Sequence, residues 1–252
     1  MGTNTGFKKF AKEHGVILEF GILFIIACIV VPNFFSVSAI FTMLKQAAVP
    51  CVAVMGMMLV LTTGGIDLSL ANTVGLCSVV LGVLTVNNGV PAWIAIIATI
   101  LVGALVGLMN GSIVQFLRVP AFITTLGSGY VIYGLAQIVG KGEQFNQLPA
   151  DLKAFGTTKV FNFIYEALPE GLQDVQILKS FLRLPSYVWI SVVIVIVMYF
   201  VRHKTVYGRD LSAFGFNAKT AKLSGINTTL LHIETYVFCS MLVAMASVLL
   251  SI

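Results

Sequence analysis

The sequence predicts an all-α fold, a polytopic bundle of transmembrane helices. Hydrophobic residues make up 58% of the 252 residues, charged residues make up only 10%, and the mean hydropathy is +0.98. A soluble domain is roughly half apolar and a quarter charged. The apolar residues also form unbroken blocks about as long as the ~20 residues that a helix needs to cross the hydrocarbon layer. Since lipid offers no partner to backbone groups, such continuous blocks indicate helices rather than the alternating strands of a barrel.

Seven segments are predicted to cross the membrane, and together they form a single transmembrane domain over 1–252. The first follows Lys8, Lys9 and Lys12. No small-residue cleavage site comes after it and further spans do, so it is predicted to be a retained anchor rather than a signal peptide. The predicted spans are 16–32, 47–63, 70–86, 91–117, 119–139, 186–202 and 229–252.

The loop charges predict the orientation, because cytoplasmic loops collect Lys and Arg. With a cytoplasmic N-terminus, loop 202–228 lies inside and loop 140–185 lies outside. The outer loop holds as many acidic as basic residues. The inner loop has a single acid, Asp210, against the basic residues Arg202, Lys204, Arg209, Lys219 and Lys222. The asymmetry supports this orientation and explains most of the net charge of +5. Nothing else in the sequence favours a nucleic-acid partner.

The sequence contains none of the common signatures of catalysis. It lacks the phosphate-binding G-x-x-x-x-G-K-[ST] motif, the G-x-S-x-G elbow and the zincin spacing of histidines. We therefore expect no catalytic residue, no metal site and no cofactor bound by this chain.

A stripe of glycines runs through the segment GALVGLMNG. Gly103, Gly107 and Gly111 are four residues apart, so they share one face of a helix and allow a neighbouring backbone to approach closely. Asn110 lies beside the stripe. Its amide either forms a hydrogen bond between packed helices or lines a polar path.

Hydroxyl side chains interrupt the apolar segment VPAFITTLGSGYVIYG, which opens with Pro120 at a favourable position for a helix start. The hydroxyls either bond to carbonyl groups of their own helix or line a hydrophilic cavity. They belong to Thr124, Thr125, Ser128, Tyr130 and Tyr133.

The segment LTTGGIDLSL places two glycines and an acid between two apolar blocks. Gly64 and Gly65 end the preceding helix, and Asp67 or Ser69 can cap the next. Two interpretations stay open: a tight turn at the membrane surface, or a broken helix whose backbone and carboxylate face a water-filled cavity.

The inner loop contains a short predicted helix. Asn217 is a good N-cap and Gly225 a good C-terminal stop, which leaves about two turns between them. The element is compact, apolar and edged by Lys219 and Lys222, so it suits a groove on a soluble partner better than a membrane surface.

Three blocks in the chain resemble one family. TTGGIDLSLA, VPAFITTLGSGYVIYGLA and TVYGRDLSAFGFNAKTAKLSGIN occur here in the order and spacing of the permease subunit of ribose-, galactose- and xylose-type ATP-binding-cassette importers. The resemblance implies a ten-span fold of the cobalamin-importer kind, of which this chain holds about seven spans and is C-terminally incomplete.

The resemblance also implies a location and partners. The permease lies in the bacterial cytoplasmic (inner) membrane, with lipid around it, and pairs with a second copy of itself. A periplasmic sugar-binding protein delivers a monosaccharide to the outer face, including loop 140–185. A separate cytoplasmic ATP-binding subunit binds the ATP and docks on loop 202–228.

Two groups of site residues follow from the resemblance. The translocation path and its hinge are expected at Gly64, Gly65, Asp67, Ser69, Asn110, Phe122, Thr124, Thr125 and Tyr130. The ATPase-coupling surface is expected at Gly208, Arg209, Ala213, Phe214, Gly215, Asn217, Ala221, Leu223 and Gly225. The chain departs from the family at Phe216, where a glycine is usual, and at Lys219, where an acid is usual.

Two alternatives remain open at this level. An ion-coupled secondary transporter needs an intramembrane acid, and the candidates are Glu19, Asp67 and Glu234. A permease of the same family can also carry a nucleoside, a furanone signal or a branched-chain amino acid instead of a sugar.

Overall fold

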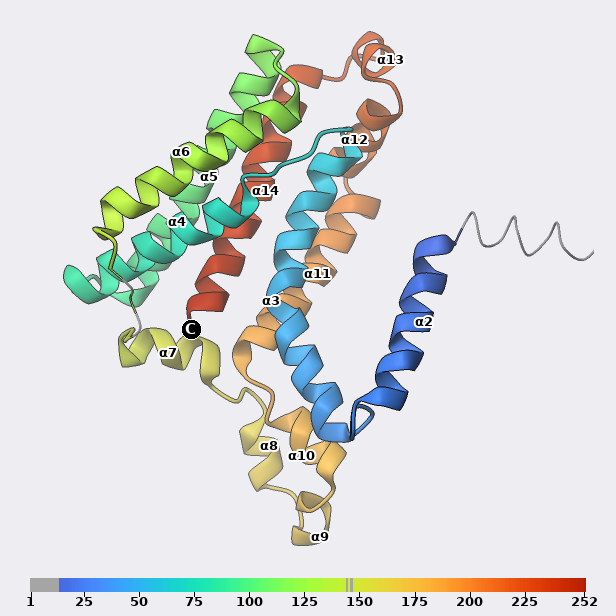
Figure 1. The fold of residues 1–252 in the computed structure, drawn as a ribbon, viewed down its shortest axis with the longest axis vertical. Coiled ribbons are helices and arrows are strands. Elements are labelled where there is room, and N and C mark those ends of the chain that lie inside the picture. The colour runs from blue at the N-terminus through green and yellow to red at the C-terminus, as the bar shows by residue number, and fades with distance from the viewer. Residues whose placement is uncertain (1–13, 144, 146) are drawn as a thin grey trace, which may run out of the picture.

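The computed structural model describes residues 14–143, 145 and 147–252 (Figure 1). Within them the regular structure is helical apart from one isolated bridge between Lys159 and Pro185. The elements in chain order are α2 Gly15–Val30, α3 Val37–Thr62, α4 Leu70–Gly82, the π-helical turn η1 Val83–Asn87, α5 Ala92–Leu117, α6 Ala121–Gly140, α7 Ala150–Thr157, α8 Asn162–Glu166, α9 Glu170–Gln173, α10 Gln176–Leu182, α11 Ser186–Lys204, α12 Val206–Phe216, α13 Ala218–Leu223 and α14 Thr228–Ser251.

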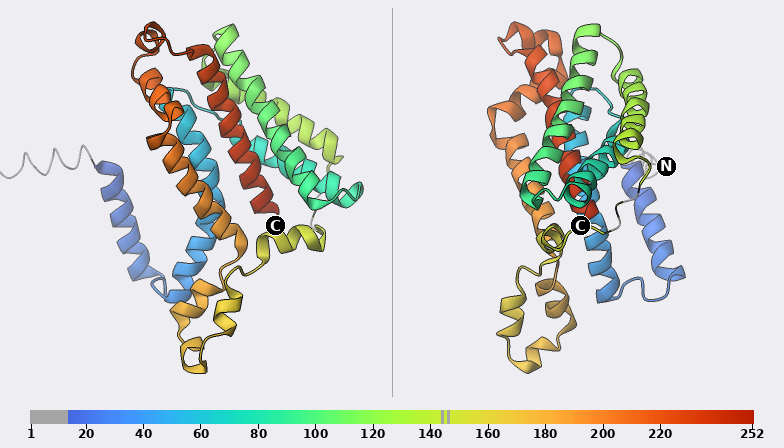
Figure 2. Two further views of the ribbon diagram at one scale, coloured as in Figure 1. Left: turned by 180° about the vertical axis from the view of Figure 1, so that it is seen from behind. Right: turned by 90° about the vertical axis from the view of Figure 1, so that its left-hand side faces the viewer.

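Six of the seven predicted spans are helices of the described chain that are long and apolar enough to cross a membrane. They are α3, α4 with η1, α5, α6, α11 and α14. The remaining predicted span corresponds to α2, which has 16 residues and therefore rises only about 24 Å. None of its residues is buried, and it stands apart on one flank of the bundle (Figure 2).

Helix α3 begins ten residues earlier than the predicted span that starts at 47. Ser36 caps it by accepting a hydrogen bond from the backbone N–H of Ala39 at 3.2 Å. Lys45 and Gln46 set the N-terminal limit of the apolar block in the sequence. Polar residues do not stop a helix that continues beyond the hydrocarbon layer. The prediction was therefore correct for the membrane-crossing part and wrong for the helix start.

The two ends of the bundle carry different elements (Figure 1). Helices α12 and α13, which form the predicted inner loop, lie at one end. The predicted outer loop 140–185 lies at the other end and contains four short helices, α7 to α10. Helices α3 and α11 both run from the α10 end to the α12 end and pack against each other.

Helix α14 occupies the centre. Over half of its most apolar window, 56%, is buried, compared with 22–33% for the other five long helices. The glycine stripe of α5 packs against it, because a Cβ added at Gly103 would lie 2.6 Å from the carbonyl oxygen of Ser240, and one at Gly107 would overlap the carbonyl oxygen of Tyr236. The predicted close helix contact is confirmed, with α14 as the partner.

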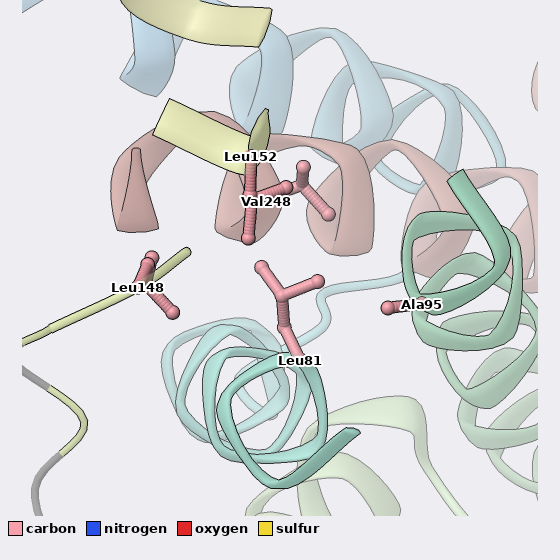
Figure 3. Packing of buried hydrophobic residues seen from close by; sticks show 5 residues of the cluster. All are labelled: Leu81, Ala95, Leu148, Leu152 and Val248. Atoms are coloured by element: carbon pink, nitrogen blue, oxygen red, sulfur yellow. The ribbon is translucent and has the colours of Figure 1, made fainter. Parts of the chain in front are cut away.

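A hydrophobic cluster joins the extramembrane helix α7 to the bundle (Figure 3). Leu152 of α7 and Leu148 before it pack against Leu81 of α4, Ala95 of α5 and Val248 of α14. At least this part of the 140–185 segment is therefore held firmly to the membrane-spanning helices.

Candidate functional site

The connection between α3 and α4 is an irregular segment in which exposed residues alternate with the buried Asp67 and Ser69. Gly64 has a φ of +81° and ends α3, while the backbone N–H of Gly65 reaches back to the carbonyl of Val60 at 3.2 Å. Beyond them Asp67 and Ser69 are buried, whereas Leu68 between them is exposed. The segment joins two helices that are each long and apolar enough to cross a membrane, and its polar side chains face other helices of the bundle. The tight turn and the broken helix both stay predictions.

A buried polar cluster of Asp67, Ser69, Asn110 and Thr125 surrounds this segment. Oδ1 of Asp67 accepts hydrogen bonds from the backbone N–H of Ser69 at 2.9 Å and from its hydroxyl at 2.6 Å. The amide of Asn110, from α5, donates to the hydroxyl of Ser69 at 2.9 Å. Ser69 thus connects the carboxylate of the segment to α5, instead of capping α4 with its side chain.

Thr125 attaches the same segment to α6. Its hydroxyl accepts from the backbone N–H of Leu68 at 3.0 Å. It also lies within hydrogen-bond distance of the carbonyls of Ala121, at 2.8 Å, and Ile66, at 3.2 Å. The hydroxyl of Thr125 therefore forms hydrogen bonds both within α6 and to the irregular backbone beside it. Backbone groups buried in a membrane protein need such partners.

The buried polar cluster is incompletely satisfied. Oδ2 of Asp67, Oδ1 of Asn110 and the hydroxyl of Tyr236 are buried without a hydrogen-bond partner. Leaving such an atom unpaired costs about 1–3 kcal/mol, so unpaired atoms that persist at one place indicate strain or a function.

The sequence did not predict Tyr236 as a residue of this site. It comes from α14, is fully buried, and its hydroxyl would lie 2.7 Å from a Cβ at Gly65. A tyrosine in the middle of an apolar span was the available signal, but only the packing of α14 against the α3–α4 connection reveals its partner.

Not every residue predicted for the path belongs to this cluster. Phe122 and Tyr130, both on α6, are 54% and 72% exposed and face away from the bundle. Thr124 is buried, and its hydroxyl has no partner. The structure therefore unites Asp67, Ser69, Asn110 and Thr125 next to Gly64 and Gly65, and leaves Phe122 and Tyr130 on an outer face.

The predicted coupling surface is built on two helices. Helix α13 agrees with the prediction: Asn217 accepts from the backbone N–H of Thr220 at 3.0 Å, and Gly225, with a φ of +87°, follows its end. Helix α12 was not predicted. Thr205 caps it by accepting from the backbone N–H of Gly208, and the apolar residues that preceded Asn217 in the sequence lie on it.

Helix α12 is anchored to three long helices. Arg202 of α11 donates to the carbonyl of Gly208 at 3.0 Å, and Gly208 itself packs on the end of α11. The hydroxyl of Tyr207 lies 3.3 Å from that of Thr235 in α14. Burial raises the pKa of Tyr207, so the phenol keeps its proton and can donate to Thr235. Phe214 stacks on His232 of α14 with ring centroids 5.3 Å apart.

Helix α12 also packs on the end of α3, next to the predicted hinge at Gly64 and Gly65. A Cβ at Gly215 of α12 would overlap the carbonyl oxygen of Thr62, the last residue of α3. Gly64, with its positive φ, lies two residues further along the chain. The predicted coupling element and the buried polar cluster are thus connected through the end of α3.

The outward side of α12 and α13 is apolar with basic neighbours. Phe216 and Leu223 are 94% and 83% exposed. Arg209 and Ala213 are exposed too, while Ala221 is buried and fixes α13 against the molecule. Arg209 and Leu223 of the predicted set form one exposed face with their neighbours Phe216, Lys219 and Lys222. We call these five residues the coupling surface, after their predicted role.

The six long apolar helices of the described chain define a polytopic membrane protein. Residues 39–252 match the family described as "Branched-chain amino acid transport system / permease component". Because the match covers most of the chain, the chain belongs to this family of transport permeases.

Similar proteins of known role are importer permeases. The ribose import permease protein RbsC of Escherichia coli (strain K12) is 28% identical over 242 residues, which cover 96% of this chain and 70% of that protein. The autoinducer 2 import system permease protein LsrC of Yersinia pestis (strain Pestoides F) is 28% identical over 237 residues, 94% of this chain but only 61% of that protein. No solved structure matches. The resemblance drawn from the three sequence blocks is confirmed.

Proposed function

We propose that the chain is the membrane-spanning permease subunit of an ATP-binding-cassette importer for a monosaccharide. In this proposal it lies in the bacterial inner membrane with its N-terminus in the cytoplasm, pairs with a second copy, receives the sugar from a periplasmic binding protein, and is driven by a separate ATPase that binds ATP. The family membership and the similarity to a ribose import permease support the proposal.

The observation that carries the mechanism is the contact of Gly215 with Thr62. An ATPase docked on the coupling surface would displace α12 and α13. Because α12 packs directly on the end of α3, that displacement would reach Gly64, where the backbone can turn, and then the segment that holds Asp67. The unpaired oxygen of Asp67 would find a partner in the other conformation, which makes the buried polar cluster a two-state element.

The docking step is tested by co-purification with the ATP-binding subunit encoded beside this chain. Phe216→Ser and Leu223→Ser should weaken the complex more than about tenfold, since exposed apolar residues at the centre of an interface carry most of its binding energy. Phe163→Ser changes a comparably exposed residue of α8 at the opposite end and should leave the complex intact. If both coupling-surface variants bind the ATPase as tightly as the wild type does, this docking site is refuted.

Gly215→Arg is a poor probe of docking. Its side chain would overlap the carbonyl of Thr62, so loss of the complex would not separate a lost contact from a displaced α12. The exposed positions Phe216 and Leu223 avoid this ambiguity because they make the surface without supporting the fold.

One alternative within the family has support of its own. The similarity to an autoinducer 2 import permease favours a furanone-type solute as the second candidate. Uptake of labelled ribose by cells that carry the complete importer, with unlabelled autoinducer 2 or ribose as competitor, decides between the two candidates.

A further inference from the structure

A basic cavity of about 440 Å³ lies at the α10 end of the bundle, away from the candidate site. It is formed between the first turns of α3 and helix α10. Four cationic residues and several hydroxyls line it, among them Lys45, Lys159, Lys179, Arg183, Thr42 and Ser180.

Among the residues that the structure describes, no Asp or Glu lines this cavity beside the four cations. The guanidinium of Arg183 lies 5.5 Å from the ring centroid of Tyr165, and its Nε is buried without a hydrogen-bond partner. A concave site with several cations and hydroxyl donors attracts an anion, and guanidinium and ammonium groups suit phosphate in particular.

A second cavity of about 350 Å³ adjoins the first and is apolar. The two share Phe41. The apolar cavity runs between α3 and α11, where Ala48 and Cys51 face Val188 and Val192, and Trp189 lines its wall. A basic cavity and an apolar cavity therefore lie side by side at Phe41.

The order of the two cavities matches the order of the layers of a membrane. Lys45 comes two residues before the apolar block of α3 that starts at 47, and Arg183 comes three residues before α11 starts at Ser186. Both helices run away from this end, so the basic cavity lies at the head-group level. The apolar cavity lies further along the same helices, at the level of the acyl chains.

We propose that these two cavities form a binding site for an anionic phospholipid. Its phosphate lies among Lys45, Lys179 and Arg183, and one acyl chain lies in the groove beside Trp189. The site is independent of the proposed transport function, because it depends only on the membrane location and on residues at the opposite end from the coupling surface.

Trp189 supplies the readout. In a Trp93→Phe background it is the only tryptophan, since the chain has two. The full chain is reconstituted in phosphatidylcholine vesicles with increasing fractions of either dibrominated phosphatidylglycerol or dibrominated phosphatidylcholine. Brominated phosphatidylglycerol should quench Trp189 at a several-fold lower fraction. Lys45→Gln and Arg183→Gln should each weaken this preference about fivefold, the effect of roughly one basic residue at an anionic membrane surface.

Lys153→Gln is the matched control, because Lys153 is an exposed cation of α7 at the same end and does not line the cavity. It should keep the preference. Equal quenching by the two brominated lipids would overturn the proposal. Reversal of the phosphatidylglycerol effect by millimolar inorganic phosphate would overturn it in favour of a free anion. Unchanged quenching in Lys45→Gln and Arg183→Gln, combined with weaker binding of the periplasmic protein, would assign the basic cavity to a protein partner instead.

Discussion

At the scale of single residues, Asp67 combines a hydrogen-bonded oxygen with an unpaired one in a buried setting. Oδ1 accepts two hydrogen bonds from Ser69, while Oδ2 has no partner. A buried carboxylate in this condition is costly. In the proposed two-state element, Oδ2 gains a partner in the other conformation.

Replacing Asp67 should distinguish a role in the conformational change from a role as a solute ligand. Asp67→Asn keeps an acceptor for Ser69 and removes the buried charge, so we expect a melting temperature at least equal to that of the wild type. Asp67→Ala removes both hydrogen bonds and should cost about 1–3 kcal/mol. Thermal unfolding of the purified chain measures both. In the assembled importer, Asp67→Asn should lower the uptake rate at an unchanged half-saturating solute concentration, because it stabilises one of two conformations. A raised half-saturating concentration at an unchanged rate would instead make Asp67 a solute ligand.

The bond between Asn110 and Ser69 is a second prediction at this scale. Ser69→Ala and Asn110→Leu each remove the bond between the two side chains, so the two effects should not add. We expect a coupling free energy of about 0.5–3 kcal/mol in a double-mutant cycle of thermal unfolding. The pair Ser224 and Asn110, which are not bonded to each other, serves as the control with Ser224→Ala. Additive effects for Ser69 and Asn110 would show that the bond contributes nothing to stability.

At the scale of elements, the contact between α5 and α14 depends on the absence of side chains. The carbonyl groups of Tyr236 and Ser240 occupy the space that a Cβ would need at Gly107 and Gly103. Helices in lipid gain stability mainly from such close packing, since lipid tails are as apolar as leucine.

Gly107→Leu should therefore be strongly destabilising, by about 1–3 kcal/mol or more, because α14 would have to move away. Gly134→Leu on α6 is the matched control, since a Cβ there meets nothing within 4 Å and leucine favours a helix over glycine. Thermal unfolding in the same detergent compares the two. Equal melting temperatures would show that α14 can shift without cost.

At the scale of the whole molecule, the bundle places α12 and α13 at one end and α7 to α10 at the other (Figure 1). The basic, acid-poor 202–228 segment is thereby separated from the charge-balanced 140–185 segment by the full length of α11. The charge distribution then predicts which end is cytoplasmic.

Labelling of introduced cysteines tests this orientation. In a background with Cys28→Ala and Cys51→Ala, Asp174→Cys should react with a membrane-impermeant maleimide in intact spheroplasts. Ser224→Cys should react only after the membrane is opened. Both positions are exposed in the structure, and Cys77 and Cys239 are buried, so the signal reports the introduced site. The opposite pattern would invert the topology.

Much of the candidate site was predictable, because several of its features depend only on short segments of the sequence. Gly64 and Gly65 predicted the break after α3, and Asn217 and Gly225 predicted α13, since caps and positive φ angles depend on a few neighbouring residues. Helix α12 was not predicted. Gly208 and Gly215 lower the helix propensity of this segment, whereas in the structure both glycines serve close packing on α11 and α3.

The sequence by itself determined the class of fold, the approximate spans and the family, because apolar block length and motif spacing are properties of the chain alone. Only the tertiary structure decided which polar residues belong together. Asp67, Asn110 and Thr125 come from three different segments. The hydrogen bond from Asn110 to Ser69 and the one from Leu68 to Thr125 depend on how α5 and α6 pack around the α3–α4 connection. The same holds for Gly215 and Thr62, which are far apart in the chain and adjacent in space. Helix packing is set by contacts summed over whole helix faces, and no short segment of the sequence contains them.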